Sequence, residues 1–302
     1  MKTKEEIKEN EENKVKTVEA NQDIEIKTDK ADNNKKHKKP ITIFGISIWR
    51  ILAYFIIYSF VGFVIETTYG AVRKGVVESR QSFLYGPFCS IYGIGACVMI
   101  VCLQKFKKSH NLLFIGGAIL GSAVEYIISL IGELIFNIRW WDYSDLPFNI
   151  NGRICVAFSF FWGVLAMYLL GSFNPKIDKL IDKLKQKIHN INLWKQVIFF
   201  TTWILLLDCL LTGVALEFFK VRKVEEYNLN VSDREHITEK YHQIYDNPRL
   251  SKFIYKFWND DKMIITFPNL KIPDKDGNII YFDSLCPGCK KYYFKIYEKY
   301  NK

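Results

Sequence analysis

The segment Val197–Phe219 reads VIFFTTWILLLDCLLTGVALEFF, and it decides the fold class of this 302-residue chain. Asp208 and Glu217 are its only charged residues. A helix needs roughly 20 largely apolar residues to cross the hydrocarbon core of a bilayer, so this segment predicts a transmembrane helix. Four similar runs precede it, at residues 46–65, 84–103, 112–136 and 154–173. The sequence therefore predicts an all-α polytopic membrane protein with about five transmembrane helices.

Polar segments flank this helical region, which we place at residues 43–219. Residues 1–42 are rich in Lys, Glu, Asn and Asp and hold too little apolar surface to offset the entropy of ordering, so we predict a disordered polar tail. Residues 220–302 predict a small hydrophilic C-terminal module, α+β or irregular. The module is expected to contain a helix at 235–245 and strands at 263–267 and 279–282, around the turn Asp276-Gly277-Asn278.

The net charge of +10 does not indicate a nucleic-acid partner, because the basic residues crowd beside the apolar runs as they do in membrane proteins. The segments after the second and fourth spans are rich in lysine. The positive-inside rule therefore predicts a multi-pass protein of the cell membrane with a cytoplasmic N-terminus. Five spans would then place the C-terminal module outside, against which three basic residues argue: Lys220, Arg222 and Lys223.

The segment 176–190 predicts an amphipathic basic helix between the last two spans. Its apolar residues recur at helical spacing with lysines on the opposite face, and they are Ile177, Leu180, Ile181, Leu184 and Ile188. One interpretation is a helix that lies on the inner leaflet of the bilayer. The other is a docking element for a separate ATPase subunit.

Motifs of soluble enzymes are missing from the sequence. It contains no Gly-x-x-x-x-Gly-Lys-[Ser/Thr] phosphate loop, so any ATPase must be a separate chain, and it contains no hydrolase motif. We therefore predict no cofactor and favour a non-enzymatic role. Cys286 and Cys289 form a lone C-x-x-C pair, and a structural zinc site would need two further ligands. We expect this pair to be unbonded, with a disulfide as the alternative if the module lies outside.

Ionisable residues within the spans point to function, because charge in a bilayer is costly and usually faces a partner or a polar path. In the third span small and acidic residues recur every fourth position along one helix face: Gly117, Gly121, Glu125, Ser129 and Glu133. The first span carries a similar stripe at Ser59, Gly62 and Glu66. Close helix packing accounts for the glycines but not for the carboxylates.

Depth along the spans groups these residues. With the N-terminus inside, Glu66, Glu133 and Glu217 fall near the outer ends of their spans, whereas Glu125 and Asp208 fall near the midplane. We predict a polar cavity that binds a substrate or an ion, with candidate residues Glu66, Arg80, Glu125, Glu133, Asp142, Tyr143, Asn149, Arg153 and Asp208. Structural ion pairing, for example of Arg153 with Glu133, is an equally favoured explanation of these charges.

The dipeptide Gly86-Pro87 predicts an irregular start to the second span. A broken or re-entrant helix start would free backbone groups that protein or water must satisfy, and such breaks often line sites. The competing interpretation is a proline in the first turn of an ordinary helix.

Residues 46–171 resemble a known bacterial family of membrane proteins, the CmpB-like type IV ABC-transporter permeases. The most specific match is Trp140-Trp141-Asp142-Tyr143-Ser144, continued by Phe148-Asn149-Ile150-Asn151-Gly152-Arg153-Ile154. Shorter matches are Gly62-x-x-x-Glu66, Phe83-Leu84-Tyr85-Gly86-Pro87, Ile91-Tyr92-Gly93, Glu125-Tyr126 and Trp162-Gly163. The resemblance implies a permease that works with a separate ATPase, and it implies no particular substrate.

Three functional hypotheses follow. The first is a transport component in which a cation or protonated amine passes the carboxylates. The second is an intramembrane enzyme in which Arg153, Tyr143 and the acids act on a lipid or envelope precursor. The third is a non-catalytic membrane scaffold with structural charge pairs. The sequence leaves a homo-oligomer open.

Overall fold

The computed structural model describes residues 41–188 and 190–296, and the described residues from Thr42 onward form one compact unit. The tail predicted at residues 1–42 lies almost wholly outside the described residues. Among the described residues, four helical stretches are long and apolar enough to cross a membrane: α2 (Ile48–Lys74), α4 (His110–Phe136), Val156–Ile188, and α7 (Ile191–Glu226). The apolar helix α3 (Ser90–Leu103), continued by a 3₁₀ turn over Gln104–Phe106, is shorter. The predicted membrane-protein fold is confirmed.

The start of α3 is irregular, as Gly86-Pro87 predicted. Residues 78–89 are not helical, so the second span begins six residues later than expected and Pro87 does not occupy a helical first turn. Two freed backbone amides of this segment find acceptors on α7. Leu84 N–H donates to Thr212 Oγ1 over 2.7 Å, and Tyr85 N–H donates to the Asp208 carboxylate over 3.1 Å.

Glycines set the spacing of the bundle helices at two crossings. A Cβ atom on Gly62 of α2 would lie 2.3 Å from Tyr92 of α3, and one on Gly121 of α4 would lie 2.4 Å from Trp162 of α5 (Val156–Tyr168). Only glycine permits these approaches. The stripe of small residues on the third span therefore packs as its spacing predicted, and it brings Trp162 onto α4.

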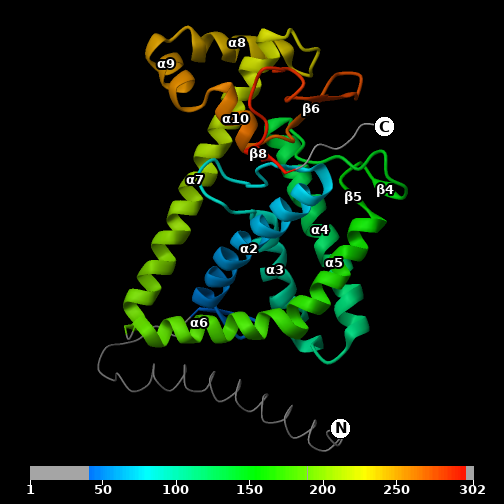
Figure 1. Cartoon of the computed structure of the whole chain (residues 1–302), viewed down its shortest axis with the longest axis vertical. Helices are drawn as coiled ribbons and strands as arrows, with labels where there is room; N and C mark the ends of the chain where they lie inside the picture. Colours follow the sequence, from blue (N-terminus) through cyan, green and yellow to red (C-terminus); the bar gives the residue numbers. More distant parts are fainter. Residues whose placement is uncertain (1–40, 189, 297–302) are drawn as a thin grey trace, which may run out of the picture. The chain divides into compact units, whose positions relative to one another are not determined.

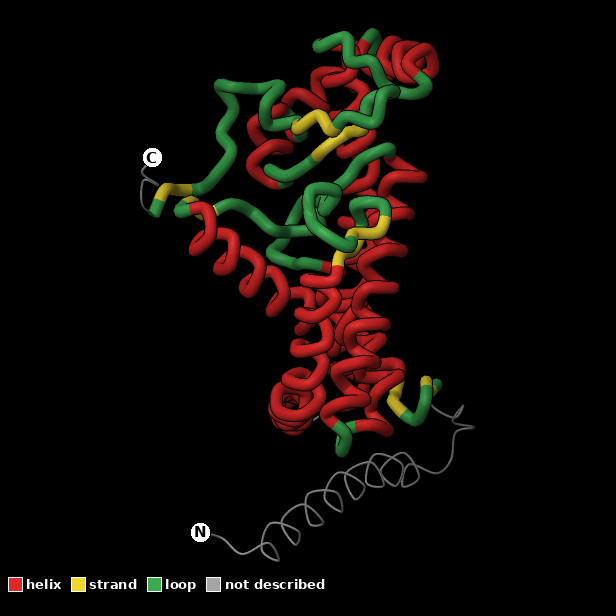
Figure 2. The backbone as a smooth tube through the Cα atoms, turned by 90° about the vertical axis from the view of Figure 1, so that its right-hand side faces the viewer, coloured by secondary structure: helices red, strands yellow, loops and turns green. Residues whose placement is uncertain are grey.

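The fourth span was predicted to end at residue 173, but helical structure continues past it through Asn174 and Pro175. A π-helical turn, Leu169–Phe173, instead leads into α6 (Asn174–Ile188), which crosses one end of the bundle (Figures 1 and 2). Ile177 and Ile181 of α6 are buried in the bundle core. We call this the α6 end.

The opposite end of the bundle carries the C-terminal residues (Figure 1), and we call it the module end. Here lie α8 (Arg234–Tyr245), α9 (Pro248–Phe257) and α10 (Asp260–Thr266), with strands β6 (Lys271–Pro273) and β7 (Ile279–Tyr281) paired antiparallel. The expected helix at 235–245 and the expected strand near 279 are confirmed. The strand expected at 263–267 is wrong, because Met263–Thr266 belongs to α10. The domain boundary at 219 stays a prediction, since α7 runs through it.

Three further short pairings complete the described structure. β1 (Thr42–Ile43) pairs with β2 (Ile46–Ser47), and β4 (Asn149–Ile150) pairs with β5 (Ile154–Cys155). β3 (Val76–Val77), which follows α2, pairs antiparallel with β8 (Phe294–Lys295) near the end of the chain. The β3–β8 pair ties the module to the end of α2.

The last turns of α7 anchor the module through buried cations. Arg222 is fully buried, and its guanidinium donates to the Asp260 carboxylate and to the Trp258 carbonyl over 3.1 Å. Lys223 also donates to Asp260, and Lys220 lies 2.7 Å from Glu217. These three basic residues therefore have acidic partners within the protein.

Candidate functional site

The loop between α4 and α5 folds onto itself at the module end. Tyr143 N–H donates to the Gly152 carbonyl over 2.8 Å, and Asn149 Nδ2 donates to the Leu146 carbonyl over 2.8 Å. Gly152 has φ of 66°, and a Cβ atom there would lie 2.3 Å from Asp142 Oδ1. Asn149 and Asp142, both predicted as site residues, thus shape the loop that positions Tyr143 and Arg153.

Arginines neutralise the acid at the end of α4. Arg139 donates two hydrogen bonds to Glu133, of 2.8 and 3.0 Å, and Arg153 donates one of 2.7 Å. Arg139 also lies 3.7 Å from Asp142. The alternative of structural pairing between Arg153 and Glu133 therefore describes this cluster, which we call the arginine cluster (Glu133, Arg139, Arg153 and Asp142).

Two turns before Glu133 on α4, Glu125 has no cationic partner among the described residues. It is 5% exposed, Tyr143 Oη donates to its Oε1 over 2.9 Å, and Trp162 Nε1 donates to its Oε2 over 3.1 Å. Both donors are neutral. Hydrogen bonds from neutral donors satisfy the lone pairs of a carboxylate but leave its charge uncompensated.

A second carboxylate lies close to the first. Tyr92 Oη donates to Glu66 Oε1 over 2.6 Å, and the Tyr92 ring lies 5.8 Å from the Trp162 ring. Tyr92 and Trp162 thus link Glu66 to Glu125, because Trp162 also donates to Glu125. Two carboxylates from α2 and α4 and three aromatic side chains thus form one connected group, the acid pair site (Glu66, Tyr92, Glu125, Tyr143 and Trp162).

The remaining predicted residues lie elsewhere. Asp208 accepts from the backbone of Tyr85 and from Thr212 Oγ1, so it caps the broken start of the second span. Arg80 lies 3.4 Å from Glu78 near the end of α2. The nine candidates therefore divide among the acid pair site, the arginine cluster with its loop, and these two separate positions.

A groove of about 510 Å³ lies between α4 and α5. Its lining is apolar except for hydroxyl groups and includes no acid or arginine; Tyr126, Ile127 and Ile154 lie along it. Ser122 donates to Ser159 over 2.7 Å across the same helix pair. This groove is not the acid-lined cavity expected from the sequence.

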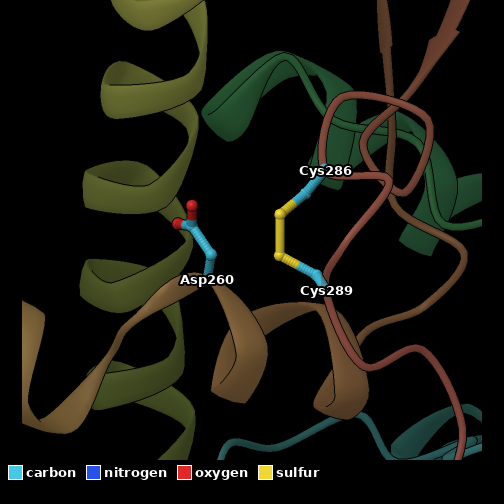
Figure 3. A group of neighbouring side chains, drawn as sticks. All are labelled: Asp260, Cys286 and Cys289. Carbon is cyan, nitrogen blue, oxygen red and sulfur yellow. A yellow bond between two sulfur atoms is a disulfide. The ribbon is translucent and has the colours of Figure 1, made fainter.

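The two cysteines of the C-x-x-C pair form a disulfide, so the expectation of an unbonded pair is wrong. Figure 3 shows the disulfide beside Asp260, and the two sulfurs and a carboxylate oxygen all lie within 4.8 Å of one another. Metal ligation by cysteine requires thiolates, and Asp260 already accepts from Arg222 and Lys223. This group could hold a metal only after reduction of Cys286 and Cys289.

The packed loop and the acid pair site both fall inside a stretch shared with known proteins. Residues 53–212, more than half of the chain, match the family described as "Putative ABC-transporter type IV". The chain belongs to this family. The match confirms the resemblance and extends it through Asp208 to Thr212, whereas the module lies beyond it. No curated protein and no solved structure matches the chain significantly.

Sequence reasoning missed three residues as members of these sites: Tyr92, Arg139 and Trp162. Tyr92 and Trp162 stand in the motifs shared with the type IV family, Ile91-Tyr92-Gly93 and Trp162-Gly163. The stripe on α4 was a second signal for an aromatic neighbour of Glu125. Gly121 precedes Glu125 by one turn and leaves room for the Trp162 ring. Arg139 directly precedes the Trp140-Trp141-Asp142-Tyr143 motif.

Proposed function

We propose that this member of the type IV family is the membrane-spanning permease subunit of a transporter, with the acid pair site as its substrate site. The observation that carries the proposal is the absence of a cation from the described surroundings of Glu125, whose two hydrogen-bond donors are neutral. Two nearby carboxylates in an apolar bundle attract a positive charge strongly, because little water screens them.

The chemistry of the site favours a metal cation or a protonated amine. Carboxylate oxygens bind both, and the Tyr92 and Trp162 rings add aromatic faces that attract cations. The enzyme alternative is less favoured, because Tyr143 and Arg153 already donate to Glu125 and Glu133. A scaffold would account for the arginine cluster but not for the uncompensated acids.

The N-terminal side of the bundle is proposed to face the cytoplasm. A disulfide persists in an oxidising compartment, which supports an outside module. At the α6 end, Lys176, Lys179 and Lys183 are exposed, while Asp178 and Asp182 of the same helix pair with Arg50. We assign this basic surface to a separate ATPase subunit, with anionic headgroups as the competing partner.

Co-purification tests that assignment. Replacing Lys176, Lys179 and Lys183 together with glutamate reverses the charge of the exposed face while leaving the Arg50 pairs intact. We expect an ATPase subunit to be recovered from native membranes with the wild-type chain and lost with the triple variant. Recovery of an ATPase with both chains would contradict docking at α6.

The substrate site is tested by cation binding to the purified chain in detergent. Trp162 contacts Glu125, so its fluorescence should report ligands, and Trp162→Phe identifies its share of the signal. We expect at least one of Na⁺, K⁺, Mg²⁺, Ca²⁺ or methylammonium to change the fluorescence. Glu66→Gln and Glu125→Gln should each weaken this response at least about tenfold, the effect of roughly 1.4 kcal/mol.

Glu217→Gln is the matched control, because it removes a bundle carboxylate that lysines neutralise, Lys220 at 2.7 Å and Lys240 at 3.1 Å. It should bind the cation as the wild type does. Uptake into proteoliposomes should follow the same order among the variants. A chain that binds none of the five cations, or whose binding survives Glu125→Gln, would refute the proposed site.

A further inference from the structure

A second hollow lies at the module end, between the end of α2 and the C-terminal residues. Its volume is about 420 Å³, within the range of small-molecule sites. The β3–β8 pair joins the two parts that line it. Its chemically distinctive lining residues are Lys74, Glu78, Tyr281, Asp283, Lys291 and Tyr292.

The lysines and acids within this lining compensate one another. Lys74 Nζ lies 2.7 Å from Glu78 Oε2, and Lys291 Nζ lies 3.6 Å from Asp283 Oδ2. Lys74 also donates to Asn269 over 3.1 Å. These pairs alone would leave the hollow without a preference for either sign of charge.

Lys271, which lies beside the lining residue Tyr281, adds a positive charge to this otherwise neutral hollow. It is 8% exposed, it pairs with Tyr281 in the β6–β7 register, and its Nζ lies 5.2 Å from the centre of the Tyr281 ring. Among the described residues no carboxylate oxygen lies within 4.0 Å of this ammonium and no acceptor bonds it. A buried charge without a counter-ion is destabilising, so its presence needs an explanation.

The surroundings of Lys271 add to the positive charge. Its backbone forms two hydrogen bonds with the backbone of Arg139, of 2.9 and 3.0 Å. Burial lowers the pKa of Lys271, and the charges of Lys74, Arg139 and Arg80 lower it further, against the opposing effect of Asp142. Lys74, Arg139 and Arg80 thus oppose the charge of Lys271, while Asp142 has the opposite effect.

We propose that the hollow binds a small organic anion. Its carboxylate or phosphate group pairs with Lys271 and Lys74, and an apolar or aromatic body packs against Tyr281 and Tyr292. Lysine ammonium groups suit such oxyanions as point charges. Lys74, Val76 and Glu78 of the lining lie at and just after the end of α2, inside the region matched to the type IV family, whereas the other six lining residues and Lys271 lie beyond that region. The site does not depend on the acid pair site.

Thermal unfolding of the full-length chain in detergent tests this site with three probes: phenyl phosphate, benzoate and inorganic phosphate. A ligand that binds only the folded protein raises its unfolding temperature with concentration. We expect phenyl phosphate to stabilise the wild type more than inorganic phosphate does. Lys271→Met should need at least tenfold more phenyl phosphate for the same shift.

The same variant separates a binding lysine from a structural one. Because Lys271 is buried without a counter-ion, Lys271→Met should unfold at a higher temperature than the wild type when no ligand is present. A structural lysine would give the opposite result. Lys256→Met is the matched control, because Lys256 also lies over an aromatic ring, Phe257 at 5.1 Å, but is exposed and outside the lining. Lys256→Met should have the wild-type unfolding temperature both without ligand and with phenyl phosphate.

The source of the anion is resolved in nanodiscs. If discs of phosphatidylglycerol, but not of phosphatidylcholine, abolish the phenyl phosphate shift, the site takes a lipid phosphate; if the shift persists in both, it takes a soluble anion. The proposal is overturned if none of the three probes shifts the wild type, or if Lys271→Met is destabilised and keeps the shift. Glu125→Gln should keep the shift, so failure here is distinguishable from failure of the transport site.

Discussion

Glu133 and Glu125 stand two turns apart on one face of α4, yet the protein surrounds them differently. At the module end Glu133 accepts hydrogen bonds from Arg139 and Arg153, whereas inside the bundle Glu125 accepts, among the described residues, only from Tyr143 and Trp162. The first carboxylate has its counter-ions within the chain. The second has hydrogen bonds but no counter-ion among the described residues, so its charge is available to a ligand.

This contrast teaches that an acid in a membrane span is interpreted from its partners and not from its depth. Asp208 gives a third case, because backbone and hydroxyl donors hold it at the broken start of the second span. We therefore expect the three acids to respond differently to substitution. The loss of stability should be largest where a substitution exposes unpaired arginines.

Glu133→Gln should cause the largest loss of stability. It leaves Arg139 and Arg153, both more than four-fifths buried, without their shared carboxylate. Breaking one partner from such a cluster costs about 3 kcal/mol, which should appear as a lower unfolding temperature in detergent. Asp246→Asn is the control, because it breaks the exposed pair with His242 and should cost less than about 1 kcal/mol. Equal losses in the two variants would show that the arginine cluster is not structural.

Asp208→Ala should have the next largest effect. It removes both acceptors of the Tyr85 N–H, a part-buried hydrogen bond to the buried Asp208, at about 1 kcal/mol. Asp208→Asn keeps one carbonyl oxygen in that place, so it should retain most of the stability and the cation response. Unfolding temperature and Trp162 fluorescence measure both outcomes. If Asp208→Asn is stable but binds no cation, Asp208 belongs to the substrate site.

Glu125→Gln should change stability least among the three acids while changing function most. Glutamine retains an acceptor for Tyr143 or Trp162, so we expect a loss below about 1 kcal/mol. The amide carries no charge, and the cation response should therefore disappear. A large loss of stability together with normal cation binding would reverse the contrast with Glu133.

Four of the five spans were predictable because the length and composition of an apolar run decide whether a helix can cross a membrane. The close packing of α4 was also predictable, since Gly117 and Gly121 recur at the spacing of one helix face. The irregular start at Gly86-Pro87 followed from local backbone chemistry. Each of these signals is carried by residues adjacent in sequence or along one helix.

The partners of the acids were not predictable, because they come from distant parts of the chain. Depth alone grouped Glu133 with Glu66, but the loop brings Arg139 to one and the α2–α3 crossing brings Tyr92 to the other. Short apolar runs were equally ambiguous. Met263–Phe267 suits a strand or a buried helix turn by composition, and Asn259, whose side chain accepts from Lys262 N–H, starts α10 there.

The smallest expected effect comes from an acid outside the bundle, in a surface turn. Asp274, between β6 and β7, accepts from the backbone of Asp276 and Asn278 over 2.9 and 2.7 Å and from the Asn278 side chain over 2.9 Å. The Asn278 side chain, with the backbone amides, lowers the pKa of Asp274 below its ordinary value. A lowered pKa in the folded state means that folding favours the ionised form.

The sign of the pH dependence follows from that shift. The stabilisation by Asp274 is complete above its unfolded pKa of about 3.9, and it is lost as the pH falls through the lower folded value. At pH 7 the wild type should therefore have a slightly higher unfolding temperature than Asp274→Ala. This difference in unfolding temperature should shrink as the pH is lowered from 5 toward 2. Asp274→Asn keeps an acceptor without a charge, so its difference from Asp274→Ala should not vary with pH. A wild-type advantage that grows on acidification would contradict an ionised Asp274 as the acceptor in this turn.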